Sequence, residues 1–352
     1  RFNSPCAGTV DKEPTMTAER PDEGLEPQSP LADIHGVRGS DQPDLVTVAC
    51  VNFAGVSGDG DATKSYRLAK MVRQVREACR QGARLVVFPE SALGAIGSTC
   101  DACSVESGPS EEHRSWAEPV PGPSTNTLAE LAAELDTYIV FGLDEVNPDH
   151  PEHIHNSAVL VGPEGVVGTY RKLHLGHPLE TRHYSPGDAL PVWETSLGSI
   201  GILICYDFWS NPELSRVLAL KGARILVNPT RSAANPGKAD YVRNTTVVRA
   251  QENLVYALSA NWTGSTGDGS AAGNSTIAGP AYPAFNNVLA SAGTEEQVVV
   301  ATLNFEQLDR WYDVFPWRQW RLDPDRQLPV TRLIASELDD LVKKYSGEPP
   351  TG

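Results

Sequence analysis

The sequence has little of what would join it to a membrane surface, a nucleic acid or a disulfide framework. Its 352 residues carry 29 Lys and Arg against 45 Asp and Glu, a formal net charge of −16 at pH 7. Such a surface repels phosphate backbones and anionic lipid, so we expect neither nucleic-acid nor membrane partners. No apolar run in the sequence approaches the roughly 18 residues needed to cross a bilayer.

Cysteine is also scarce, with six residues in a chain of this length. That number does not build a disulfide framework, which favours a reducing, cytoplasmic setting. Cys100 and Cys103 form a lone C-x-x-C motif that lacks the second ligand pair of a structural zinc site. The motif does not open a thioredoxin-like helix either, so we predict neither a metal nor a cofactor.

Composition divides the chain into three parts. Residues 1–44 are rich in Pro, Asp, Glu, Ser and Gly and are predicted to be a disordered or loosely attached leader. Residues 45–305 hold the regular patterns of one domain, and residues 306–352 form a C-terminal extension. Within that extension, Arg310–Arg321 concentrates aromatic and arginine side chains, which favour an oligomer contact. A tail that packs on its own domain is the alternative.

Strand and helix patterns alternate twice along residues 45–305, with hairpins between the two series. Leu45–Phe53 and Ala83–Phe88 are apolar strand patterns, and residues 62–81 between them repeat apolar positions at helical spacing. A second strand, helix and strand series follows from Ile200, and Asp240–Glu252 is predicted to be a helix. We therefore expect an α/β fold in which two mixed sheets lie face to face with helices outside.

The stretch Gly198–Thr230 contains the clearest local unit. An apolar run from Ile200 to Ile204 ends at Cys205, and a helical pattern then separates it from a second apolar run, Ala223–Val227. A thiol at the carboxyl end of a strand lies near free backbone N–H groups, which stabilise a thiolate. Taken alone, a buried core cysteine is the alternative reading of Cys205.

Two other polar residues follow apolar strands in the same way. Glu90 follows Leu85–Phe88 and one proline, and Lys172 follows Val166–Tyr170 by two residues. A thiol attacks a carbonyl or nitrile carbon, a carboxylate transfers the protons, and a cation stabilises the oxyanion. Glu90, Lys172 and Cys205 therefore predict cysteine-dependent amide chemistry.

These residues and their neighbours resemble the signature blocks of the carbon–nitrogen hydrolase, or nitrilase, superfamily, and its amidase-like branch in particular. The blocks are Phe88-Pro89-Glu90, Tyr170-Arg171-Lys172 with His174, and Cys205-Tyr206-Asp207 with Pro212-Glu213-Leu214. The resemblance spans about residues 45–305 and implies a four-layer αββα sandwich.

The resemblance also implies roles. Glu90 would be the general base and then acid, and Cys205 the nucleophile that forms a thioester. Lys172 and the backbone N–H of Tyr206 would hold the oxyanion. Glu180, eight residues after the lysine, would position that lysine and the attacking water, with a solvated loop charge as its alternative.

The substrate is harder to predict. His174 is expected to support the lysine loop, and Phe208, Trp209 and Thr230 to contact substrate. Tyr206-Asp207 is unlike the Trp-Glu pair that follows the cysteine in typical nitrilases. Positions 208–211 also lack the arginines that bind a substrate carboxylate in carbamoyl-amino-acid hydrolases, although Arg231 could replace them. We therefore expect a small neutral carboxamide, apolar or aromatic, to be converted to acid and ammonia.

Other activities of the same site stay open. An N-carbamoyl amine or amino-acid amidohydrolase and a nitrilase use related chemistry. An acyltransferase would pass the same acyl group to an amine instead of water. The family resemblance further suggests a homodimer or higher homo-oligomer.

Overall fold

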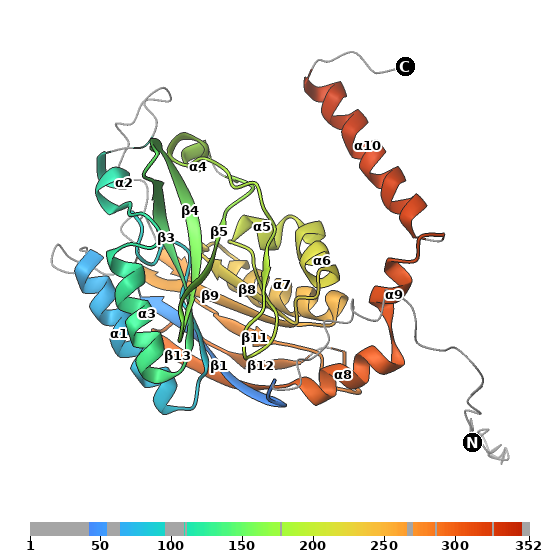
Figure 1. Cartoon of the computed structure of the whole chain (residues 1–352), viewed down its shortest axis with the longest axis horizontal. Helices are drawn as coiled ribbons and strands as arrows, with labels where there is room; N and C mark the ends of the chain where they lie inside the picture. The colour runs from blue at the N-terminus through green and yellow to red at the C-terminus, as the bar shows by residue number, and fades with distance from the viewer. Residues whose placement is uncertain are drawn as a thin grey trace, which may run out of the picture.

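The computed structural model describes residues 42–54, 64–95, 109, 111–176, 178–265, 270–285, 287–325 and 327–346. Two β-sheets lie face to face with helices outside each of them (Figure 1). The two sheets are joined where β1 and β9 pair in parallel, Phe53 opposite Trp262. This is the four-layer αββα sandwich, so the predicted fold class is confirmed.

The first sheet has the strand order β5-β4-β3-β2-β1-β13 and the second the order β6-β7-β8-β9-β11-β12. The strands of the first are β1 (Leu45–Ala54), β2 (Leu85–Val87), β3 (Tyr138–Asn147), β4 (His150–Gly162), β5 (Gly165–Arg171) and β13 (Gln297–Asn304). Those of the second are β6 (Val192–Trp193), β7 (Ile200–Ile202), β8 (Ile225–Thr230), β9 (Tyr256–Ser265), β11 (Thr276–Ala278) and β12 (Val288–Ser291). The short strand β10 (Ser270–Ala272) pairs antiparallel with the end of β9.

Helices cover the outer face of each sheet. The first sheet is covered by α1 (Lys64–Arg80) and α3 (Pro123–Leu135), the second by α6 (Pro212–Leu220) and α7 (Lys238–Asn253). Three short helices lie in loops: α2 (Glu111–Trp116), α4 (Pro178–His183) and α5 (Tyr206–Trp209). The chain continues through α8 (Phe305–Val314), α9 (Trp317–Arg321) and α10 (Leu328–Ser346). None of the described helices combines the length and apolarity needed to span a bilayer.

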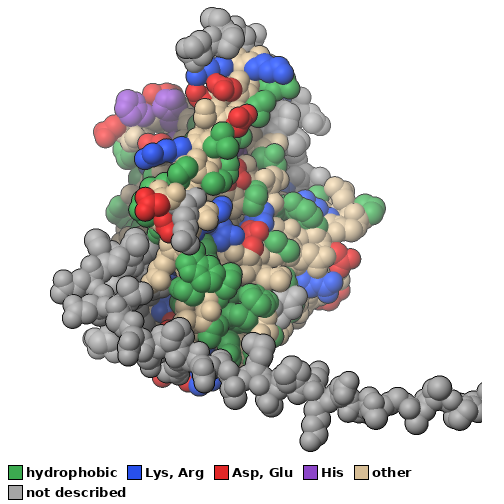
Figure 2. Space-filling view, turned by 90° about the vertical axis from the view of Figure 1, so that its right-hand side faces the viewer, with side chains coloured by type: hydrophobic (Ala, Val, Ile, Leu, Met, Phe, Trp, Pro, Cys, Tyr) green, Lys and Arg blue, Asp and Glu red, His purple; other side chains and the backbone are tan. Residues whose placement is uncertain are grey.

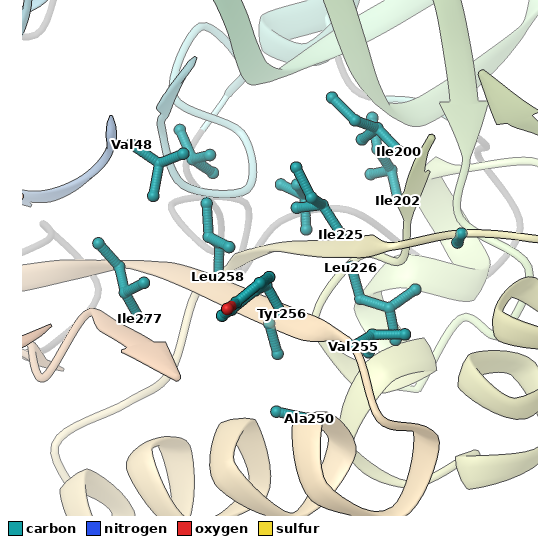
Figure 3. Close-up of a cluster of buried hydrophobic side chains, with 14 of the residues drawn as sticks. Val48, Ile200, Ile202, Ile225, Leu226, Ala250, Val255, Tyr256, Leu258 and Ile277 are labelled. Carbon is teal, nitrogen blue, oxygen red and sulfur yellow. The ribbon is translucent and has the colours of Figure 1, made fainter. Parts of the chain in front are cut away.

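Side-chain alternation along the strands explains the layers. On β1, Val46 and Val48 face the core between the sheets, whereas Val51 and Phe53 face the helices α1 and α3. The second sheet alternates likewise: in Figure 3, Ile225 points to one side and Leu226 to the other, where Ala250 of α7 lies. Each sheet is thus apolar on both faces, and polar side chains gather where the strands end.

The C-terminal extension divides into two parts. Trp311, Tyr312 and Trp317 of α8 and α9 are buried in the core of their own domain. Helix α10 has no buried residue and extends away from the body of the molecule (Figure 1). Helices α8 and α9, residues 305–321, therefore pack on their own domain, whereas α10 is exposed. Of the predicted leader, residues 1–41 lie outside the described residues, while Gln42 donates to the Leu197 carbonyl at 2.7 Å.

Candidate active site

The structure brings together the three polar residues that follow apolar strands. Glu90 follows β2 and Lys172 follows β5, both in the first sheet, while Cys205 lies three residues after β7 in the second. Because the sheets face each other, their strand ends approach one another at one end of the sandwich. The three groups lie close enough for their charges to act on one another. The charge of Cys205 raises the pKa of Lys172, while Glu90 raises and Lys172 lowers the pKa of Cys205.

Lys172 lies at the centre of a buried ion cluster. Its Nζ is 2.8 Å from Glu90 Oε1 and 2.5 Å from Glu180 Oε1, and its side chain is 2% exposed. Burial alone would lower the pKa of Lys172, but the negative charges of Glu90, Cys205 and Glu180 outweigh burial and raise it. The lysine therefore stays a cation, as an oxyanion-binding group requires.

Glu180 is held in place by the loop that follows the lysine. Its second oxygen, Oε2, accepts from the Gly176 backbone N–H at 2.8 Å. The Glu180 carboxylate thus links the start of α4 to Lys172. These contacts differ from those of a solvated loop charge, the alternative considered for Glu180.

Cys205 occupies a strained turn between β7 and α5. Its φ is 48° and its ψ is −104°, a region that non-glycine residues rarely adopt. Its backbone N–H donates to the Pro229 carbonyl and to Asn228 Oδ1, both at 3.0 Å. Both acceptors belong to the neighbouring strand β8, which holds the turn in place. Strain of this kind persists where the surroundings fix it, and it collects at functional sites.

The surroundings of the Cys205 sulfur disfavour its thiolate form. Burial and the Glu90 charge raise the pKa of Cys205 to about 12, and Lys172 and the Thr230 hydroxyl lower it by less. Lys172 does oppose the rise in pKa, but it does not reverse it. A thiol in such surroundings would need a base to act as a nucleophile, and Glu90 is the carboxylate whose charge acts on it.

Asp207 ties the lysine loop to the cysteine helix. It is fully buried and accepts from the Tyr170 hydroxyl at 2.6 Å and from the Leu173 N–H at 2.9 Å. His174 adds two contacts to the same carboxylate, from its backbone N–H at 2.8 Å and its Nδ1 at 2.9 Å. His174 therefore lies where a loop-supporting residue would, and its ring contacts Asp207.

The residues predicted to contact substrate are placed differently from one another. Tyr206 is the first residue of α5, a position whose backbone N–H has no partner within the helix. Thr230 is buried at the end of β8 beside the sulfur. Phe208 is fully buried in the hydrophobic core, and Trp209 is 7% exposed. The backbone N–H groups of Phe208 and Trp209 both donate to the Cys205 carbonyl at 3.0 Å, so α5 holds both residues next to the cysteine.

Sequence reasoning missed several residues that fix the site. Asn156, on β4, donates from Nδ2 to Glu90 Oε1 at 2.8 Å, and its carbonyl accepts from the Lys172 N–H at 2.9 Å. Arg249, on α7, donates to the Phe208 and Trp209 carbonyls at 2.9 Å each and so anchors α5. The available signal for Asn156 was a polar residue interrupting the start of an apolar strand.

In the described part of the chain, no group of three or more His, Cys, Asp or Glu side chains is arranged to hold a metal ion. Cys100 and Cys103 lie outside the described residues.

Comparison with known proteins agrees with the geometry. Residues 47–313 match the family model described as carbon–nitrogen hydrolase. The chain is 35% identical to a nitrilase of Pyrococcus abyssi over 68% of this chain and 84% of that protein. It is 32% identical to an (R)-stereoselective amidase of Pseudomonas over 79% of this chain and 93% of that protein. Nit3 of Saccharomyces cerevisiae shares the fold, with a TM-score of 0.65 at 24% identity over 81% of this chain and 99% of that one. The chain belongs to the carbon–nitrogen hydrolase family, in the nitrilase superfamily, and is a hydrolase of non-peptide carbon–nitrogen bonds.

Proposed function

We propose that this protein is an amidase that hydrolyses a small carboxamide to a carboxylic acid and ammonia through a thioester on Cys205. The observation that carries the proposal is the buried cluster in which Lys172 bridges Glu90 and Glu180 beside the sulfur. The amidase relative supports the choice of an amide over a nitrile. So does the Tyr206-Asp207 pair after the cysteine, which differs from the Trp-Glu pair of typical nitrilases.

The first half of the reaction forms the acyl-enzyme. The Cys205 sulfur attacks the amide carbon while its proton moves to Glu90, and the carbonyl π electrons move onto oxygen. The Lys172 ammonium and the Tyr206 N–H stabilise the resulting oxyanion. Glu90 then delivers its proton to the nitrogen, the carbon–nitrogen bond breaks, and ammonia leaves. A thioester and an ionised Glu90 remain.

The second half hydrolyses the thioester. Glu90 accepts a proton from water as the water oxygen attacks the acyl carbon, with Glu180 holding Lys172 and the water in position. The carbon–sulfur bond then breaks, the proton passes from Glu90 to sulfur, and the carboxylic acid departs. Each correctly placed acid, base or oxyanion donor contributes ~10²–10⁴ in rate.

A substrate panel tests the proposal. Ammonia release is measured on matched amides, nitriles and N-carbamoyl compounds, with the Cys205→Ala variant as the blank. We expect the amides to be the best substrates. A higher kcat/KM for the nitriles or the N-carbamoyl compounds would replace the amidase with the corresponding alternative activity.

Hydroxylamine in the same assay separates hydrolysis from acyl transfer. Both activities share the thioester, but an acyltransferase admits an amine where an amidase admits water. We expect the acid to remain the main product, and a hydroxamate formed in preference to the acid would favour the acyltransferase. The homodimer and the cytoplasmic setting stay predictions, and so does the neutral acyl group, which depended on finding no cation near Cys205 in the sequence.

A further inference from the structure

The backbone carbonyl of Glu90 is bound by a residue of the opposite sheet. Trp262 lies on β9, and its indole Nε1 donates to the Glu90 carbonyl oxygen at 2.7 Å. The indole is fully buried, and the two residues lie 172 positions apart in the sequence. Trp262 also pairs with Phe53 at the point where the two sheets are joined. The hydrogen bond therefore connects Glu90 directly to the sheet that carries Cys205.

The turn at Glu90 has a backbone conformation that needs such support. Ser91, the next residue, has a φ of 51°, which non-glycine residues rarely adopt. Strand β3 lies so close to this turn that a Cβ on Gly142 would overlap the Ser91 nitrogen. A strained turn keeps its shape only where the surrounding contacts fix it. The carbonyl that Trp262 binds belongs to the peptide between Glu90 and Ser91, so the indole holds the strained peptide itself.

The indole ring is held in place by its own neighbours. It meets Phe53 edge to face at 4.9 Å, and the guanidinium of Arg67 lies 5.4 Å from the ring centroid. A cation over an aromatic ring is attracted by the ring quadrupole. Arg67 also donates to the Gly94 carbonyl at 2.9 Å, so it contacts the segment that follows the Glu90 turn. The indole N–H thus has a fixed position before any substrate binds.

The carboxylate of Glu90 is fixed differently from its backbone. Its Oε1 accepts from Lys172 and from Asn156, both at 2.8 Å, and both residues come from the first sheet. These contacts set the carboxylate relative to its own sheet. They do not set its distance from the Cys205 sulfur, which lies beyond the end of a strand of the second sheet. Trp262 supplies a contact across the two sheets, and proton transfer requires the distance between base and thiol to be short.

We infer that Trp262 is a positioning residue for Glu90, which holds the base of the first sheet within proton-transfer reach of the nucleophile of the second. The inference rests on the proposed function, in which Glu90 takes the proton of Cys205. Trp262 acts through the Glu90 backbone and not on the substrate. A core tryptophan that contributes only to packing is the alternative, and it predicts a loss of stability without a specific loss of proton transfer.

Removal of the indole N–H tests the inference. Trp262→Phe keeps an aromatic ring at this position, and benzothienylalanine at position 262 keeps the whole bicyclic shape with sulfur in place of the N–H. We expect both changes to lower kcat ~10-fold with little change in KM, because a misplaced base slows the chemical step and not substrate binding. Trp311→Phe is the matched control. That tryptophan is also buried, and its Nε1 has no acceptor within the described residues, so its replacement should leave kcat unchanged.

A double-mutant cycle separates positioning from packing. If Trp262 acts through Glu90, Trp262→Phe should cause no further loss of ammonia release in the Glu90→Gln background, with Cys205→Ala as the blank. A packing role predicts the same fold loss in both backgrounds. Alkylation of Cys205 by iodoacetamide gives a second readout that needs no turnover. The Glu90 charge raises the pKa of Cys205, so a displaced carboxylate should lower the pH midpoint of alkylation, and Trp262→Phe should not lower it further in the Glu90→Gln background.

Equal fold losses in the two backgrounds overturn the inference, as does a wild-type kcat in the benzothienylalanine variant. In either case the wild-type enzyme still turns over amides, so the proposed function survives. Absence of ammonia from every amide of the substrate panel, together with no acyl adduct on Cys205 by mass spectrometry, overturns the proposed function instead.

Discussion

The buried ion cluster of Lys172, Glu90 and Glu180 and the exposed helix α10 both place side chains in surroundings that such side chains normally avoid. Around Lys172 the interior holds charged groups, and each has a partner of opposite sign or a hydrogen bond. On α10, large apolar side chains such as Leu338 and Val342 stand 57% and 66% exposed, and no residue of the helix is buried. The charged groups of the first region are paired within one chain, whereas α10 leaves its apolar side chains exposed. Loss of a group should therefore abolish function in the first region and leave the fold intact in the second.

Cys205→Ala should have the largest effect. Without the sulfur no thioester can form, so amide turnover falls to background, while the fold persists because the backbone contacts to β8 remain. Ammonia release and a thermal melt measure the two quantities. Cys79→Ala on α1 is the matched control and should keep full activity. Turnover above background in Cys205→Ala would remove this residue from the mechanism.

Glu90→Gln should come next, with kcat/KM for amides reduced ~10²–10⁴-fold, because the thiol then lacks its base. The same change removes a negative charge that raises the pKa of Cys205, whereas Lys172, which lowers it, remains. The pH midpoint for alkylation of Cys205 by iodoacetamide should therefore move below the value in the wild type.

In Glu90→Gln, amide hydrolysis should therefore fall while alkylation of Cys205 moves to lower pH. Glu134→Gln, which changes the same charge on the exposed surface of α3, should alter neither quantity. A normal rate of acyl-enzyme formation in Glu90→Gln, followed by mass spectrometry, would contradict the role of Glu90 as base.

The sequence predicted the parts of this site that follow a local pattern. Glu90, Lys172 and Cys205 each follow an apolar run. The order of such runs predicted two mixed sheets with helices outside, and the family resemblance implied the four-layer αββα arrangement. Asn156 was not predicted, and neither were the contacts of Asp207, because their partners lie 66 and 37 residues away, a separation that no period in the sequence encodes. The left-handed backbone of Cys205 was equally hidden, because nothing in the residue type demands it.

Asn156→Ala should have a smaller effect on activity than either of these changes. It removes one of the two donors to Glu90 Oε1, so the carboxylate keeps its charge partner but loses its fixed orientation. We expect kcat to fall ~10-fold with little change in KM, and the free energy of unfolding to fall by about 1–3 kcal/mol. Ser157→Ala, the next residue, removes a buried hydrogen bond to Glu145 instead and should lower stability but not kcat. Equal losses of kcat in Asn156→Ala and Ser157→Ala would show that Asn156 has only a structural role.

Removal of α10 should have the smallest effect on the activity and stability of the single chain, and a measurable effect on its oligomeric assembly. A deletion starting at residue 306 would uncover the core that Trp311 and Trp317 fill, so any change in sedimentation would mix unfolding with dissociation. A deletion of residues 328–352 avoids this, because α10 buries nothing in its own domain. We expect unchanged kcat and an unchanged melting temperature, since no core contact is lost.

If the extension is an oligomer contact, the same deletion should lower the sedimenting mass. Figure 2 shows hydrophobic side chains among charged ones on the side of the molecule that carries α10. On an ordinary protein surface, exposed apolar side chains are scattered singly among charged ones. A continuous row of them along one helix face favours a contact with a partner. Ile334→Glu with Leu338→Lys should reproduce the shift without shortening the chain, and Asp340→Asn on the same helix should not. An identical sedimenting mass in all variants would show that α10 contributes nothing to assembly, and that any oligomer is built by the domain itself.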